Sequence, residues 1–95
     1  MKRLNIARGI PFETKAYACI HVFEGTRPAL YVTREDGDWA ILCGGVHPED
    51  PDYYPVVGLG HIVEADPALK EILDLTHNQE AERAVVGGPW TRVQL

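Results

Sequence analysis

The sequence predicts a small α+β domain, a three- to four-stranded antiparallel sheet in meander order with two short helices packed on one face. Residues 27–45 have the pattern of a β-hairpin, and residues 17–23 form a short apolar run rich in β-branched and aromatic side chains. Residues 66–75 open with Asp-Pro and carry an apolar stripe at helical spacing. The chain has 95 residues, 45% of them hydrophobic and 24% charged, which is typical of one globular domain.

The first fifteen residues differ in character from the rest. They mix charge with Gly9 and Pro11 and lack periodicity, so we expect an N-terminal arm over residues 1–15 and a single α+β domain over residues 16–95. The basic start is interrupted before any apolar run follows, unlike a secretory signal. No stretch reaches the roughly 20 apolar residues of a membrane span. We therefore expect a cytoplasmic protein with reduced cysteines.

Three strands are predicted in the first half of the chain. The first covers residues 17–23 and stops before Gly25, and the second and third cover residues 29–33 and 39–43. Between the last two, Asp36-Gly37 supplies the positive φ that a tight turn requires. Residues 56–60 are compatible with a short fourth strand, and residues 61–64 with its end or with one helical turn.

Two helices are predicted after the sheet. Asp66 caps the first, Pro67 suits its first position, and the helix runs over residues 68–75. Its apolar stripe is Leu69, Ile72 and Leu73. Thr76 and Gln79 have the spacing of a capping box, which favours a second helix over residues 78–84. Residues 90–93 suit a terminal strand or an anchor for the tail.

The charge balance narrows the classes of partner. Nine Lys and Arg against fourteen Asp and Glu give a formal net charge of −5, which disfavours binding to nucleic acid or to an anionic membrane. An acidic surface suits a basic protein partner. The candidate partner-binding residues lie in a proline-rich acidic loop and are Glu49, Asp50, Asp52, Tyr53 and Tyr54. A homodimer joined through exposed strand edges is compatible with the same pattern.

Two cysteines and two histidines make up the main candidate metal site, as Cys19-x-His21 and Cys43-x3-His47. If the first and third strands come together with matching faces, these four side chains form a tetrahedral zinc site. In the other reading, both cysteines are small buried hydrophobic residues and His21 is a packed histidine.

A thiol enzyme is a third interpretation of the same residues. Cys43 followed by Gly44-Gly45 leaves backbone amides free to hold an oxyanion, with His47 or His61 as the base. The chain contains no serine, so mechanisms that use a serine nucleophile are excluded.

Glu49, Asp50 and Asp52 offer oxygen ligands for a divalent cation. They lack the glycine turn and final glutamate of an EF-hand loop, which favours a solvated acidic loop.

Several segments resemble a family of small uncharacterised bacterial proteins. These segments are residues 37–45 (GDWAILCGG), 57–62 (VGLGHI), 66–69 (DPAL) and 81–83 (AER). The chain is also distantly similar to a domain-of-unknown-function group proposed to include bacterial immunity proteins, which bind and neutralise a toxin. The resemblance implies a non-enzymatic, immunity-like protein-binding module and supplies no catalytic residues. The alternative is a small metal-binding or thiol-dependent enzyme that uses the Cys/His residues.

Overall fold

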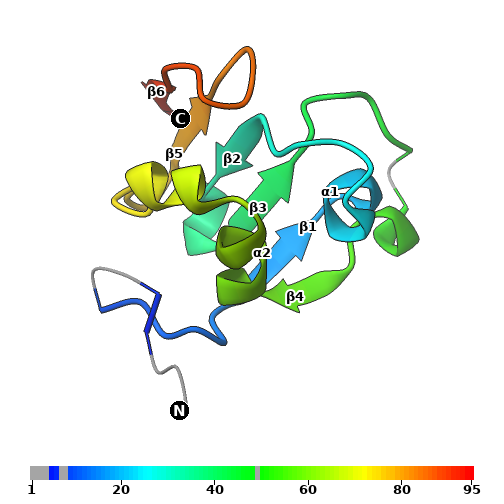
Figure 1. Ribbon diagram of the computed structural model, residues 1–95, viewed down its shortest axis with the longest axis horizontal. Coiled ribbons are helices and arrows are strands. Elements are labelled where there is room, and N and C mark those ends of the chain that lie inside the picture. The colour runs from blue at the N-terminus through cyan, green and yellow to red at the C-terminus, as the bar shows by residue number, and fades with distance from the viewer. Residues whose placement is uncertain (1–4, 7–8, 49) are drawn as a thin grey trace.

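The chain forms one mixed β-sheet with helices on one side of it (Figure 1). The computed structural model describes residues 5–6, 9–48 and 50–95. The strands in this part of the chain are β1 (Lys15–Ala18), β2 (Tyr31–Thr33), β3 (Trp39–Leu42), β4 (Val56–Gly58), β5 (Gln79–Glu82) and β6 (Thr91–Gln94). They lie in the order β4-β1-β3-β2-β5-β6, with β1 and β3 parallel and the other neighbours antiparallel.

The predicted three- to four-stranded antiparallel meander is therefore wrong. The sheet has six strands among the described residues, and β1 pairs with β3 instead of β2. Parallel neighbours need a long crossover connection, which here consists of a short helix and the whole of β2. A meander is the simplest order for three consecutive strands. The sequence of each strand does not indicate which other strand it pairs with, so the crossover could not be predicted.

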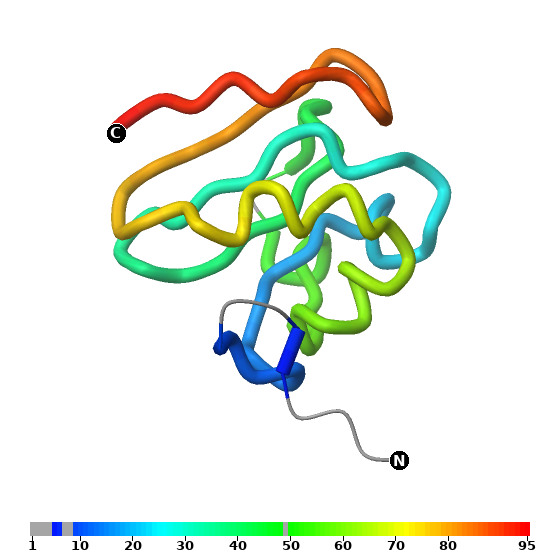
Figure 2. The backbone as a smooth tube through the Cα atoms, turned by 60° about the vertical axis from the view of Figure 1, so that its left-hand side comes forward, coloured from blue at the N-terminus to red at the C-terminus, as the bar shows by residue number. Residues whose placement is uncertain are grey.

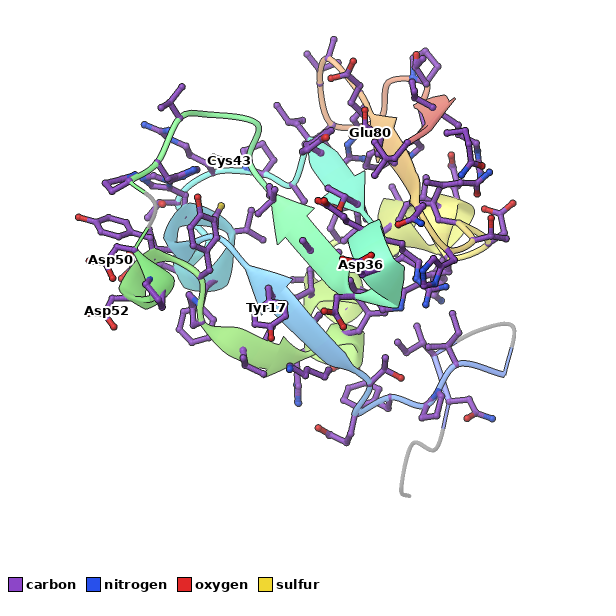
Figure 3. All side chains as sticks on the ribbon, turned by 180° about the vertical axis from the view of Figure 1, so that it is seen from behind. Tyr17, Asp36, Cys43, Asp50, Asp52 and Glu80 are labelled. Atoms are coloured by element: carbon purple, nitrogen blue, oxygen red, sulfur yellow. The ribbon has the colours of Figure 1, made fainter. Side chains whose placement is uncertain are left out.

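The helical elements are short. The two α-helices are α1 (Ile20–Glu24) and α2 (Leu59–Ala65), and the 3-10 turns are η1 (Glu35–Gly37), η2 (Pro51–Tyr53) and η3 (Pro67–Ile72). Seen from behind, the strands lie in front of α2 and η3, which cover the opposite face (Figure 3). The core lies between that face and these helices and includes Val32, Ile41, Leu59, Leu69 and Ile72. Among the described residues, no helix has the length and apolarity required to cross a membrane.

The predicted central hairpin is confirmed. Strands β2 and β3 pair antiparallel, with Val32 opposite Ile41. In the turn between them, Asp36 and Gly37 both have positive φ, +54° and +85°. The turn is also tied to a distant segment, because the Asp36 amide donates to the Asn78 side chain. The hairpin thus bridges the two halves of the chain.

The predicted first strand is too long. Strand β1 ends at Ala18, and α1 occupies the rest of the run, closed by Gly25 in the left-handed conformation (φ +76°). Residues 17–23 are apolar on both faces, so periodicity cannot separate a strand from a short helix there. Gly25, at the position after the helix, is the sequence feature that favours a short helix over a strand there.

The predictions for the second half are partly confirmed. Asp66 does cap a helical element by accepting from the Ala68 amide, but the predicted helix over residues 68–75 is instead the shorter 3-10 helix η3. The predicted stripe, Leu69, Ile72 and Leu73, is buried. The predicted helix over residues 78–84 is wrong, because β5 lies there. The Gln79 side chain does accept from the Thr76 amide, but Asn78 has a φ of +61°, which closes a turn and leads into a strand. The possible strands near residues 56–60 and 90–93 are confirmed as β4 and β6.

The described part of the N-terminal arm packs at the base of the sheet, away from the C-terminal strand (Figure 2). The Phe12 ring is buried against α2, where a Cβ on Gly60 would lie 2.3 Å from it. This close approach explains a glycine within a short helix.

Arg83 connects the second half of the chain to the first. Its side chain is fully buried, and it donates to the Ala29 carbonyl and to the Asp66 carboxylate at 2.5 Å. The guanidinium also lies over the Trp90 ring. Removing one member of a buried ion pair leaves the other without compensation, so this arginine is important for stability.

We expect Arg83→Met to lower the free energy of unfolding by about 2–4 kcal/mol, because the Ala29 carbonyl and the Asp66 carboxylate lose their donor. The matched control is Arg92→Met, because Arg92 pairs with Asp74 at the surface. That change should cost less than about 1 kcal/mol. Urea unfolding followed by circular dichroism measures both, and equal losses would contradict the role assigned to Arg83.

Candidate metal centre

The four residues that the sequence singled out as metal ligands lie together. One donor atom from each of Cys19, His21, Cys43 and His47 lies within 4.8 Å of every other, and this set could hold a metal ion. We call it the Cys/His cluster. Both cysteines are buried and both histidines are half-buried, so the cluster lies at the boundary between core and solvent.

The parallel pairing of β1 and β3 brings the two cysteines together. Ala18 is paired with Ile41, and Cys19 follows one strand while Cys43 lies just beyond the other. Because parallel strands point the same way, both cysteines reach the same edge of the sheet. There the Cys43 amide donates to the Cys19 sulfur, at a distance of 3.3 Å.

Two local turns bring in the histidines. The chain passes from β1 directly into α1, so His21 lies on the helix and not on a stiff strand. After β3, Gly44 adopts a φ of +84°, which only glycine adopts readily, and the loop returns to the cluster at His47. The ligand pairs Cys19-x-His21 and Cys43-x3-His47 thus both lie where regular structure changes direction.

The donor atoms are close to contact. His21 Nδ1 lies 2.8 Å from His47 Nε2, and the Cys43 sulfur lies 3.5 Å from His47 Nε2 and 3.8 Å from His21 Nδ1. His21 Nδ1, His47 Nε2 and the Cys43 sulfur thus lie close enough together to bind the same metal ion.

The surroundings of Cys43 favour its thiolate. Burial alone raises the pKa of this thiol, but the Gly45 amide, the Cys19 side chain and the Arg27 guanidinium outweigh it and lower the pKa overall. The Gly45 amide donates to the sulfur at 3.4 Å. A thiolate is the form of cysteine that binds metals and attacks electrophiles.

Burial is also the main cause of the pKa shifts of Cys19 and His21, two other residues of the Cys/His cluster. Burial raises the pKa of the Cys19 thiol, although the Val22 and Cys43 amides oppose it. Burial, Arg27 and His47 together lower the pKa of His21. The neutral imidazole is therefore favoured at His21, and it is the form that can donate a lone pair to a metal.

The third histidine considered for this region is elsewhere. His61 lies on α2, 3.6 Å from the Glu13 carboxylate and edge-on to the Phe12 ring. It is not among the residues of the Cys/His cluster. The pairing of Cys43 with His61 as a catalytic base therefore finds no support in this geometry.

The predicted partner-binding residues lie in the loop that begins at the cluster. Asp50 and Asp52 are exposed, and the Asp50 side chain accepts from the Asp52 amide to start η2. They lie at the same end of the sheet as Cys43 (Figure 3). Tyr53 is exposed, whereas Tyr54 is half-buried with its ring 5.9 Å from that of His47. Glu49 lies outside the described residues.

Sequence reasoning missed Arg27 and Gly45. Both act on the Cys43 sulfur, and the space beside Gly45 is filled by Arg27, whose Nη1 would lie 3.2 Å from an added Cβ. Arg27 is sixteen positions away from Cys43 in an unremarkable loop, so no spacing rule identifies it.

Comparisons with protein-family models, curated proteins and solved structures found no match for this chain. The resemblance to a bacterial family therefore stays a prediction.

We expect the two cysteines of the metal-free protein to react at different rates. Cys43 has the lowered pKa and some exposure, whereas Cys19 is fully buried with a raised pKa. At neutral pH, iodoacetamide should modify Cys43 at least about tenfold faster than Cys19. Peptide mapping by mass spectrometry gives both rates. Arg27→Gln should slow only Cys43, and equal rates in the unmodified sequence would contradict the assigned environments.

Proposed function

We propose that the protein binds one Zn²⁺ ion through Cys19, His21, Cys43 and His47, and that this ion has a structural role. The carrying observation is the agreement between the donor spacing and a tetrahedral zinc site. With Zn–S bonds of about 2.3 Å and Zn–N bonds of about 2.0–2.1 Å, a nitrogen and a sulfur of a tetrahedron lie about 3.5 Å apart. The two sulfur-to-nitrogen distances at Cys43 are 3.5 Å and 3.8 Å.

The two imidazoles need only a small adjustment. Tetrahedral coordination separates two nitrogens by about 3.3 Å, and the ring nitrogens of His21 and His47 lie 2.8 Å apart. A slight rotation of His47, which lies on a loop, provides the difference. Without a metal, the same contact is a hydrogen bond between one protonated and one unprotonated ring nitrogen.

The donor types favour zinc over the other common biological metals. Thiolate and imidazole in a four-donor site match Zn²⁺, whereas Mg²⁺ and Ca²⁺ prefer oxygen ligands. Four protein donors leave no open coordination position, which is typical of structural and not of catalytic zinc. The Cys43 and Gly45 amides donate to the two sulfurs, as outer-shell groups do in metal sites.

The role follows from what the ligands connect. Two ligands precede or belong to α1, and two belong to the segment that leaves β3. One ion therefore fastens a five-residue helix and an irregular loop to the parallel pair of strands. A chain of this size has a modest core, and a bound metal adds to its stability.

We expect native mass spectrometry of the purified protein to show one zinc per chain. His47→Ala should lose the ion yet keep the fold, because His47 lies on a half-exposed loop. With free zinc at about 100 to 1,000 times its dissociation constant, the free energy of unfolding should be about 3–4 kcal/mol higher than in a sample from which a chelator has removed the zinc.

The matched control is His61→Ala, which removes a histidine outside the cluster and should leave zinc binding unchanged. Co²⁺ provides a second readout, since tetrahedral Co²⁺ bound to thiolates absorbs visible light. A protein that carries no zinc, binds no Co²⁺ and unfolds identically with and without chelator would overturn the proposal.

A further inference from the structure

No helix in the described part of the chain covers the face of the sheet that is opposite α2 and η3. Its side chains come from alternate positions of the strands, opposite to the buried ones, and we call it the open face. Register pairs join its members into two rows. The first is Val56, Tyr17, Ala40, Thr33, Glu80 and Val93, and the second is Leu42, Tyr31, Glu82 and Thr91. Figure 3 looks onto this face and shows Tyr17 near its middle and Glu80 toward its far edge.

The open face is unusually apolar for a surface that water covers. In antiparallel sheets with one solvated face, residues along each strand usually alternate between apolar ones that face the core and polar ones that face water. Here Tyr17, Ala40 and Leu42 are half-buried on neighbouring strands, and the Lys15 ammonium lies 4.8 Å from the centre of the Tyr17 ring. Val56 and Val93 toward the two edges are 56% and 46% exposed. An exposed apolar patch rimmed by charge is typical of a protein-binding surface.

The charge of this face is negative at its β5 side. Glu80 and Glu82 lie on β5, and Glu35 follows the end of β2. The Tyr31 hydroxyl donates to the Glu80 carboxylate. That hydrogen bond, burial, and the carboxylates of Glu82 and Glu35 raise the pKa of Tyr31 to about 12. The hydrogen bond to Glu80 is the largest cause of this raised pKa, and the neighbouring carboxylates add to it.

A hollow connects this acidic side to the Cys/His cluster. It has a volume of about 510 Å³, and its lining residues are Leu30, Tyr31, Cys43, Gly44, Glu80, Glu82 and the buried Arg83. Two of the lining residues, Glu80 and Glu82, carry carboxylates. A lysine or arginine side chain matches the charge of these two groups.

We propose that the open face binds a basic segment of another protein, with apolar side chains over Tyr17, Ala40 and Leu42 and a cationic side chain in the hollow beside Glu80 and Glu82. The inference goes beyond the zinc site and does not depend on it. It also differs from the interface predicted from the sequence, which consisted of Glu49, Asp50, Asp52, Tyr53 and Tyr54. Charge complementarity identifies the partner's chemistry, because a nucleic acid would bring phosphates against these carboxylates.

The probe is a short synthetic peptide in which arginine alternates with valine, titrated at physiological ionic strength into isotopically labelled protein as isolated. Shifts of backbone amide resonances should concentrate on Tyr17, Tyr31, Ala40, Leu42 and Glu82. Glu82→Lys should weaken binding at least about tenfold. The matched control is Glu71→Lys on η3, which makes the same charge change away from the open face and should alter affinity less than about twofold.

Two further peptides test whether binding needs both the positive charge and the apolar side chains of the first peptide. Replacing arginine by glutamate should abolish binding, and replacing valine by glycine should weaken it. Equal losses in the two variants, shifts centred on Asp50 to Tyr54, or no binding of the arginine–valine peptide would each overturn the proposal. So would sedimentation that shows a dimer joined through this face and lost in Glu82→Lys. The zinc content, measured separately by mass spectrometry, does not enter this result.

Discussion

The parallel pairing of β1 with β3 is the contact on which the rest of this structure depends. Strands that are neighbours lie about 4.8 Å apart, whereas strands separated by a third lie about twice as far. In a meander, β2 would lie between β1 and β3, and Cys19 and Cys43 could not approach each other. With β3 in the centre, both cysteines leave the sheet at the same edge, and Cys43 donates its amide to the Cys19 sulfur.

The same pairing explains why the cluster requires so little additional structure. Once the two cysteines are adjacent, each histidine needs only a short local change of direction. His21 lies two residues beyond Cys19 because β1 gives way to α1 at once, and His47 returns because Gly44 adopts positive φ. The proposed metal would fasten a pairing between two strands that α1 and β2 separate along the chain, and closing such a loop costs entropy.

The sequence predicted the parts that depend on local chemistry. The turn at Asp36-Gly37, the cap at Asp66 and the stripe of Leu69, Ile72 and Leu73 are each encoded within a few residues, and each was correct. The four metal-ligand candidates were identifiable by residue type alone. The strand order was not, because pairing between distant segments leaves no local pattern. Nor was the role of Arg27, which reaches Cys43 only through the folded chain.

Alternate side chains along each strand point to opposite faces of the sheet, so one strand has to suit both the core and the outer surface. On β2, the central residue Val32 is fully buried, while Tyr31 and Thr33 on either side face outward. On β5, Ala81 is buried between Glu80 and Glu82. Core packing fixes the residues of the covered face, but it places no demand on the opposite face beyond solubility. Polar residues satisfy that demand best, so Tyr17, Ala40 and Leu42 on the opposite face need a different explanation. The proposed contact with a basic partner would explain these residues, because they form an apolar surface bordered by Glu80 and Glu82.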